Sequence, residues 1–483
     1  MNSVSANISA SKHSSGSLEL AVTNLITAWL LIVPWLIGGR FWWTQALGAG
    51  VGAVALALAL SIKENRRTLW RFPVFWLGLL FLSYVACQAL NPWAVAVRHR
   101  ADILLWDMFL IKNVSWLPAG VSGNYFEMST WRMFVYWLAP WLLVCAWWAA
   151  VKRRRSGRRL ILLVFLNGLA TAAVILVQKI HPPSKYMWVY LDPTTPLNLV
   201  HATSAGFISW DHAAMFLYLS LGAGLALSAR FMARARSEGR DTGFAWIVLL
   251  GCLALVGIFF ILGSRAGLVI ACVYFVLGLI ILLAASLRGG GKLPGVWAGA
   301  LVLLLALAGL VTYELQGNHS WTLARQRYLS TLNQEDTRAV LRLETLRMMQ
   351  PRFWLGWGAG SYRYVSPDYF REDYIFQSSS TYGGVAFYTD YAHSDWLQFA
   401  MEFGVVGASL ALAVLVYWFG YAVWLGRRLG VEGWLILIGA AAILAHAAVD
   451  FPMFNTAVVT LFCLLIASVI KTASLEARTI VRR

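Results

Sequence analysis

Four groups of polar residues stand where the surrounding sequence is strongly apolar. They are His393, which precedes a long apolar stretch, Ser264 with Arg265, Asp211 with His212, and His446 with Asp450. Histidine can act as a base near neutral pH. Arginine offers a planar fork that matches phosphate oxygens. These residue types are therefore suited to acid–base chemistry and to phosphate binding.

Each group also has a structural interpretation. A lone histidine at the start of a helix, such as His393, is more often structural than catalytic. His446 and Asp450 lie four residues apart, on one face of an expected helix, and could form a hydrogen-bonded pair. Ionisable groups at membrane depth are costly and usually face the protein interior.

An arginine-rich segment accompanies these groups. Residues 316–394 contain no lysine, and their arginines are Arg325, Arg327, Arg338, Arg342, Arg347, Arg352, Arg363 and Arg371. The stretch 336–350 is predicted to be a helix, with Pro351 after its end. On it, Arg338 and Arg342 lie one turn apart. They either bind a phosphate substrate or belong to a solvated face that contacts lipid phosphates and nearby glutamates.

Two further patterns lie in the same segment. On the expected helix, Val340, Leu343 and Leu346 share one face. Gly356–Gly360 is predicted to be a tight loop and not a nucleotide-binding loop, because no strand precedes it. The aromatic residues of the segment suit sugar rings, although Trp and Tyr also gather at membrane interfaces.

The elements that position these residues are predicted to cross a membrane. Of the 483 residues, 59% are hydrophobic and 13% are charged, so a soluble fold could not cover its surface with polar groups. A helix needs roughly 20 apolar residues to cross the hydrocarbon layer, and it satisfies its backbone polar groups internally. We expect an all-α polytopic membrane protein with about twelve transmembrane helices. The expected spans are 24–39, 44–62, 72–90, 133–151, 160–180, 213–232, 244–262, 267–287, 296–315, 403–425, 433–450 and 456–470.

Basic residues collect in alternate connections between these spans. With the N-terminus inside, the short inner connections hold Lys63 to Arg71, Lys152 to Arg159, Arg230 to Arg240, Arg288 with Lys292, and Arg427 with Arg428. This is the positive-inside pattern, which predicts that both termini are cytoplasmic. The net charge of +17 then reflects topology and contacts to anionic lipids, and no nucleic-acid partner is expected.

The expected organisation has five parts. The first part is a disordered cytoplasmic tail at residues 1–17, and the second holds nine spans at residues 18–315, with outer loops at 91–132 and 181–212. The third part is one large outer loop at residues 316–394. Three spans follow at residues 395–470, and a second cytoplasmic tail follows at residues 471–483. No cleaved signal peptide is expected. Long loops without regular structure are uncommon unless they have a function. The large loop is therefore the expected carrier of the chemistry.

The segment HSDWLQFAMEFGVVG resembles the signature of the O-antigen ligase family. In that signature, His and a small polar residue are followed after nine residues by Gly-x-x-Gly; here the matching residues are His393, Ser394, Gly404 and Gly407. Three other stretches are similar to the wider ligase and polymerase superfamily: Ser264-Arg265-Ala266-Gly267, the run from Arg338 to PRFWLGWGAGSY, and the segment from His446 to AVDFPMF. The ordered set covers most of residues 200–460.

The resemblance implies a membrane-embedded glycosyltransferase of the GT-C type, inverting and independent of metals and cofactors. The donor would be a glycan on undecaprenyl diphosphate, and the acceptor would be a hydroxyl of lipid A-core. The large loop between the ninth and tenth helices would face the periplasm from the bacterial inner membrane. His393 would take the acceptor proton. Arg265 and Arg338, helped by Arg342, would hold the diphosphate. The supporting polar residues would be Asp211, His212, His446 and Asp450.

Other functions compete with this one. A polymerase of the same superfamily joins repeat units, with a second lipid-linked glycan as acceptor. A protein O-oligosaccharyltransferase is a third member of this class. A flippase for lipid-linked glycans belongs to a different class and predicts internal repeats with broken helices in matching halves. The sequence shows no such repeat, so an enzyme is favoured.

Overall fold

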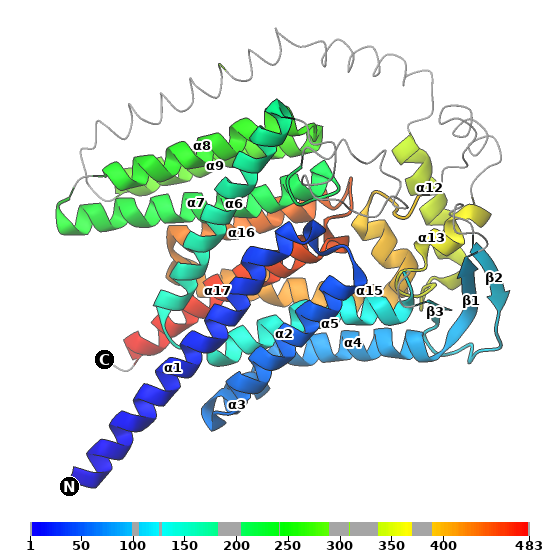
Figure 1. The fold of residues 1–483 in the computed structure, drawn as a ribbon, viewed down its shortest axis with the longest axis horizontal. Helices are drawn as coiled ribbons and strands as arrows, with labels where there is room; N and C mark the ends of the chain where they lie inside the picture. Colours follow the sequence, from blue (N-terminus) through cyan, green and yellow to red (C-terminus); the bar gives the residue numbers. More distant parts are fainter. Residues whose placement is uncertain are drawn as a thin grey trace.

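Long helices make up most of the chain, and a small β-sheet stands at one end of them (Figure 1). This computed structural model describes residues 2–98, 106–124, 128–181, 204–240, 242–288, 309, 337–369 and 389–481. Both termini lie on the side of the bundle away from the sheet (Figure 1). The helices are α1 (Asn2–Ile32), α2 (Trp42–Leu60), α3 (Lys63–Trp70), α4 (Pro73–Leu90), α5 (Thr130–Ala150), α6 (Arg154–Ile180), α7 (Trp210–Glu238), α8 (Gly243–Leu262), α9 (Arg265–Arg288), α12 (Thr337–Met349), α13 (Tyr362–Val365), α15 (Asp395–Leu425), α16 (Gly430–His446) and α17 (Thr456–Val481).

Ten segments of the described chain are helical and are long and apolar enough to cross a membrane. One of them, Asp395–His446, contains both α15 and α16, where the tenth and eleventh spans were predicted. The predicted ninth span, 296–315, lies outside the described residues except for residue 309. The helical, polytopic class is confirmed, and the count of twelve stays a prediction.

Helices extend into both predicted tails. Helix α1 begins at Asn2, so residues 2–17 are helical and not disordered, and α17 continues to Val481 through most of 471–483. The cytoplasmic side of both tails stays a prediction. Extending an existing span by a few turns avoids the unfavourable nucleation that an isolated helix would need. The first span also ends earlier than predicted, because 3-10 turns with positive φ at Gly38 and Gly39 follow Ile32.

Helix α7 forms the centre of the bundle and is almost entirely buried. It packs against α6, α8, α9 and α16, and small residues let such helices approach closely. A Cβ on Gly222, for example, would lie 2.5 Å from the Tyr274 hydroxyl of α9. Because Asp211 and His212 stand in its first turn, this packing fixes the position of two candidate site residues.

The helix predicted at 336–350 is present as α12, but the predicted apolar face is not the buried one. Leu343 and Leu346 are 51% and 47% exposed. The buried stripe instead carries Leu341, Thr345 and Met348, which recur at helical spacing and lie where α12 packs against α15. Exposed leucines are common on protein surfaces, so apolar spacing alone does not identify the face of α12 that packs inward.

A mixed sheet, which the sequence did not predict, forms within residues 91–132, the segment predicted to be an outer loop. Its strands are β1 (Pro92–Arg98), β2 (Trp106–Leu110) and β3 (Gly120–Gly123), in the order β2-β1-β3, with β2 antiparallel and β3 parallel to β1. Trp93 Nε1 donates to the Trp357 carbonyl at 2.8 Å, and Trp106 meets Tyr364 edge-on at 5.2 Å. The sheet therefore supports the segment that follows α12.

That segment wraps around a break in α15 at Gly404, where φ is +61° and ψ is −178°. The facing residue is Gly356, with φ of +71°. A Cβ on Gly404 would lie 2.4 Å from the Trp354 carbonyl oxygen, and one on Gly356 would lie 2.4 Å from that of Glu402. Only glycine lets the two backbones touch and adopts these positive φ values without strain.

Hydrogen bonds hold the Gly356–Gly360 loop against the break. The backbone N–H of Gly358 donates to the Glu402 carbonyl at 2.8 Å. The buried Glu402 carboxylate accepts from the Gly360 N–H and from the Gln398 amide, both at 2.9 Å. Gln88 of α4 accepts from the Ala359 N–H at 3.1 Å. The predicted tight loop is present, and it ties α4, α12 and α15 together beside His393.

We expect Gly404→Ala to lower the stability of the folded protein substantially. A residue with a Cβ at this φ costs about 1–3 kcal/mol, and its collision with the Trp354 carbonyl adds to that cost. Thermal unfolding of the purified protein in detergent measures the change. Gly420→Ala in the same helix is the matched control, because a Cβ there meets nothing within 4 Å. Equal unfolding midpoints for both variants would contradict this role of the break.

Candidate active site

The loop enters the bundle at His393, immediately before α15. Its φ of +50° lies in the left-handed region, which histidine adopts more readily than most residues. The backbone is held on both sides: the Ala392 N–H donates to Gln398 Oε1 at 3.0 Å, and the Asp395 N–H donates to the Ala447 carbonyl at 2.8 Å. These contacts fix the position of the His393 ring relative to the end of α16.

His393 Nδ1 lies 3.2 Å from Asp450 Oδ1. The His393 side chain is 28% exposed, whereas that of Asp450 is 1% exposed. A carboxylate that accepts a proton-bearing Nδ1 fixes the tautomer in which Nε2 carries the free lone pair. The pair therefore has the arrangement of a general base, with the buried acid behind a partly open imidazole.

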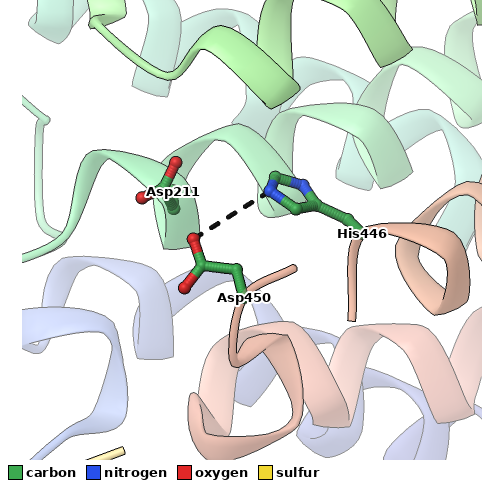
Figure 2. Close-up of side chains that lie close together, drawn as sticks. All are labelled: Asp211, His446 and Asp450. Atoms are coloured by element: carbon green, nitrogen blue, oxygen red, sulfur yellow. Dashed lines mark ion pairs between the residues drawn. The ribbon is translucent and has the colours of Figure 1, made fainter. Parts of the chain in front are cut away.

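Asp450 lies beyond the end of its helix, although the predicted span continued to residue 450. Helix α16 ends at His446, and the Asp450 N–H still donates to the His446 carbonyl at 3.0 Å. Asp450 Oδ2 lies 4.0 Å from His446 Nε2 (Figure 2), and within the described chain neither atom has a hydrogen-bond partner. His446 Nδ1 lies 3.3 Å from the hydroxyl of Tyr218 in α7. The turn thus lets one acid reach both histidines.

Asp211, near the start of α7, lies beside Asp450 and His446 (Figure 2). Ser264 Oγ donates to Asp211 Oδ1 at 2.5 Å and accepts from the Gly267 N–H at 3.1 Å. Ser264 therefore links α7 to the turn between α8 and α9 and caps α9. Arg265 is the first residue of α9, and its side chain lies outside the described part of the chain.

Phe451 is the common apolar contact of the site. The rings of His212 and His393 both meet it edge-on, at 4.9 and 5.0 Å, and Tyr391 stacks on it at 4.3 Å. His212 Nε2 also lies 3.3 Å from the Phe451 carbonyl oxygen. The sequence indicated His212 as a polar helix start, but nothing in it showed that Phe451 would hold both histidine rings.

Helix α12 brings one predicted arginine to this group of residues. Arg338 Nη1 lies 3.4 Å from the carbonyl oxygen of Val449, the residue before Asp450. Arg342 lies one turn further along α12 and is half-buried. The structure thus brings Arg338 to the site, and a substrate contact of Arg342 stays a prediction.

A second group of cations, which the sequence analysis did not bring together, lies next to Tyr391. Arg363 Nη2 lies 2.6 Å from Asp390 Oδ1, and Arg40 Nη2 lies 3.9 Å from Asp390 Oδ2. Arg132 Nη2 donates to the Arg40 carbonyl at 2.7 Å. Burial opposes the charge on Arg363, but the adjacent Asp390 carboxylate raises its pKa above the usual value. The place of Arg363 in the arginine-rich segment was the only signal in the sequence.

The environment of Asp450 keeps it ionised. Burial alone would raise its pKa, but the hydrogen bond with His393 and the contacts with Asp211 and His212 lower the pKa to about 2. A pKa lowered by folding means that the carboxylate stabilises the fold above its unfolded pKa of about 3.9. That contribution is lost as the pH falls through about 2. A negative charge therefore stands behind His393 at neutral pH.

Asp211, His446 and Asp450 also form a group that could hold a metal ion. One ligand atom from each lies within 4.8 Å of the others, and two carboxylates with an imidazole are common ligands of divalent cations. A buried water could satisfy the same atoms. The expected independence from metals is therefore a matter for experiment.

The comparisons with known proteins agree with the sequence motifs. Residues 250–412 match the family model described as O-antigen ligase, which confirms the resemblance drawn from the sequence. No curated protein matches the chain. The matched range runs from α8 into α15, and Asp211 and Asp450 lie outside it. This region, which holds Ser264, Arg338, His393 and Gly404, is therefore similar to the O-antigen ligase family.

Proposed function

We propose that the protein is a glycosyltransferase that moves a glycan from undecaprenyl diphosphate to a hydroxyl of lipid A-core. The observation that carries this proposal is the contact between His393 and the buried Asp450, of which His393 lies within the range that matches O-antigen ligase. The residues around the pair come from α7, α12, α15 and α16. A site built from so many elements is rigid enough to orient two substrates.

His393 acts as the base in this mechanism. The acceptor hydroxyl gives its proton to Nε2 while its oxygen attacks the anomeric carbon from the face opposite the diphosphate. The new bond joins this oxygen to the anomeric carbon, and the bond from that carbon to the diphosphate oxygen breaks. The configuration at the anomeric carbon inverts. Asp450 stabilises the positive charge that then develops on the imidazole.

The departing diphosphate gains negative charge and needs cations close to it. Arg338, beside Val449, is the described arginine that supports this role directly. Arg265 begins α9 next to Ser264, whose hydroxyl contacts Asp211, and Arg342 follows on α12. These three arginines are the proposed clamp, with Asp211, His212 and His446 as supporting groups.

The proposed site lies at one end of the membrane-crossing helices, which suits a substrate whose lipid tail stays in the bilayer. Asp211 begins α7, His446 ends α16 and Asp395 begins α15, so all three mark the same end. The basic connections lie at the other end, as at Arg230 to Arg240 of α7. By the positive-inside rule, the site faces the periplasm and the termini face the cytoplasm of a bacterial inner membrane.

A reconstituted reaction tests the proposal. Purified protein in liposomes receives lipid-linked glycan and lipid A-core on the same side, and the expected product is a new glycosidic bond with release of undecaprenyl diphosphate. Movement of the lipid-linked glycan across the bilayer without a new bond would show a flippase. Products that grow on the lipid carrier would show a polymerase, and glycan attached to a protein would show an O-oligosaccharyltransferase.

Deletion of the gene in its host gives an independent answer. If the protein is a ligase, long chains attached to lipid A-core disappear and carrier-linked polymer accumulates. If it is a polymerase, single repeat units remain attached to lipid A-core. The size distribution of the surface polysaccharide therefore separates the two activities within the family.

We expect the reaction to proceed after removal of divalent metal ions. Arg338 and its neighbours supply the positive charge that a metal would otherwise provide, so the group of Asp211, His446 and Asp450 needs no ion for the proposed chemistry. Transfer by the purified protein is measured before and after dialysis against a chelator. Loss of transfer that Mn²⁺, Mg²⁺ or Zn²⁺ restores would assign a metal to this group instead.

A further inference from the structure

A cleft lined by arginines lies at the end of the bundle opposite His393. It has two adjoining parts, of about 370 and 330 Å³, which share Arg158, Ile161 and Glu432. It opens between the start of α6, the end of α7 and the start of α16. The length of α16 separates this cleft from His446: Glu432, which lines the cleft, lies in the first turn of α16, and His446 is the last residue of the same helix. At 1.5 Å per residue, the two lie about 20 Å apart.

The side chains that line this cleft carry mostly positive charge. Among the described residues that line it, Glu432 is the only acidic one, and the arginines are Arg155, Arg158, Arg159, Arg230, Arg236 and Arg428. Arg230 Nη1 approaches Glu432 Oε2 only to 3.9 Å, and this buried nitrogen has no hydrogen-bond partner among the described residues. Arg155, Arg158 and Arg428 form no ion pair in the part of the chain that the structure describes.

Most of the remaining lining is apolar, with Ser286 and Thr472 as polar exceptions. Ile161 and Leu162 of α6, with Leu227 and Phe231 of α7, line the cleft below the guanidinium groups. Helices α6 and α7 are both long and apolar enough to cross a membrane, and these four residues lie in them next to the arginines. Guanidinium groups bind phosphate oxygens in pairs, and apolar side chains accept an acyl chain. A molecule with an anionic phosphate head and a hydrocarbon tail matches both halves of the lining.

We propose that this cleft binds the phosphate headgroup of an anionic phospholipid, with Arg158 and Arg230 as the central contacts. The bound lipid holds α6, α7 and α16 together at the end of the bundle away from the site. The phosphate lies between guanidinium groups that otherwise repel one another. Binding to the folded state alone raises its stability. This inference is independent of the proposed transferase activity.

Thermal unfolding in nanodiscs tests the proposal. The protein is placed in phosphatidylcholine alone or in phosphatidylcholine mixed with phosphatidylglycerol, and the expected result is a higher midpoint in the mixture. The double variant Arg158→Gln/Arg230→Gln should need roughly tenfold more phosphatidylglycerol for the same shift, because charge-assisted hydrogen bonds are lost. The matched control is Arg67→Gln/Arg71→Gln, which removes the same charge from the end of α3, outside the cleft, and should behave as the wild type.

Two other results of these unfolding measurements would overturn the proposal. Equal losses in both double variants would show diffuse attraction to a charged surface without a defined site. If inorganic phosphate in plain phosphatidylcholine discs gives the same shift, the cleft binds free phosphate and no lipid. Should the glutamine variant fail to fold, Arg158→Lys/Arg230→Lys keeps both charges but loses the planar fork, and a weakened phosphatidylglycerol response is again expected.

Discussion

Replacement of His393 by alanine should reduce glycan transfer by roughly 10²–10⁴-fold, the usual contribution of a general base. His393 is the partly exposed member of the pair with Asp450, so its Nε2 can reach an acceptor hydroxyl. The protein should still fold, because the neighbouring contacts of Ala392 and Asp395 hold this part of the backbone. The measurement is the rate of product formation by purified protein in liposomes.

A second substitution separates chemistry from backbone strain at this position. Alanine is strained at the φ of +50° that His393 adopts, whereas asparagine tolerates it well. His393→Asn should therefore keep the wild-type unfolding midpoint and still lose transfer, because an amide cannot accept the proton. His181→Ala is the matched control, since His181 is exposed at the end of α6. Near-normal transfer by His393→Asn would remove His393 from the role of base.

Sequence patterns located the elements of this protein better than their orientations. Apolar runs marked the helices, and the stretch 336–350 was identified as a helix within a residue of α12 at each end. The inward face of α12 was not found, because Leu343 and Leu346 point outward while Leu341 and Thr345 are buried. Apolar atoms make up a large share of any protein surface, so three apolar residues at helical spacing do not by themselves identify the side of a helix that packs inward.

The sequence predicted which residues belong to the candidate site, but it did not predict which of them contact one another. Asp211, His393 and Asp450 were singled out separately, as polar residues beside apolar runs. Their convergence depends on the end of α16 at His446, after which the chain turns and brings Asp450 to His393. The ion pair of Arg363 with Asp390 depends likewise on tertiary packing. A single sequence carries no local signal for either contact.

Asp450→Asn should lower transfer nearly as much as loss of the base, by roughly 10²–10⁴-fold. An asparagine at this place keeps the shape of the side chain but removes the charge that stabilises the imidazolium of His393. It can also present an N–H to Nδ1, and that contact favours the wrong tautomer. Because Asp450 is only 1% exposed and lies behind His393, we expect kcat to fall with little change in KM. A merely structural role predicts instead a lowered unfolding midpoint with unchanged kcat in the folded fraction.

The pH dependence and a charge-matched control make this prediction specific to Asp450. The pKa of Asp450 is lowered to about 2, so the acid stays ionised from about pH 5 to 8. Over that range, the ratio of wild-type to Asp450→Asn rates should show no step caused by its titration. Asp450→Glu keeps the charge and should recover part of the activity. Asp368→Asn removes a carboxylate from an exposed position in the segment that follows α12 and should leave kcat unchanged. If Asp450→Asn had the same kcat as Asp368→Asn, the buried charge of Asp450 would have no part in activating His393. His393 would then act as a base without help from this carboxylate.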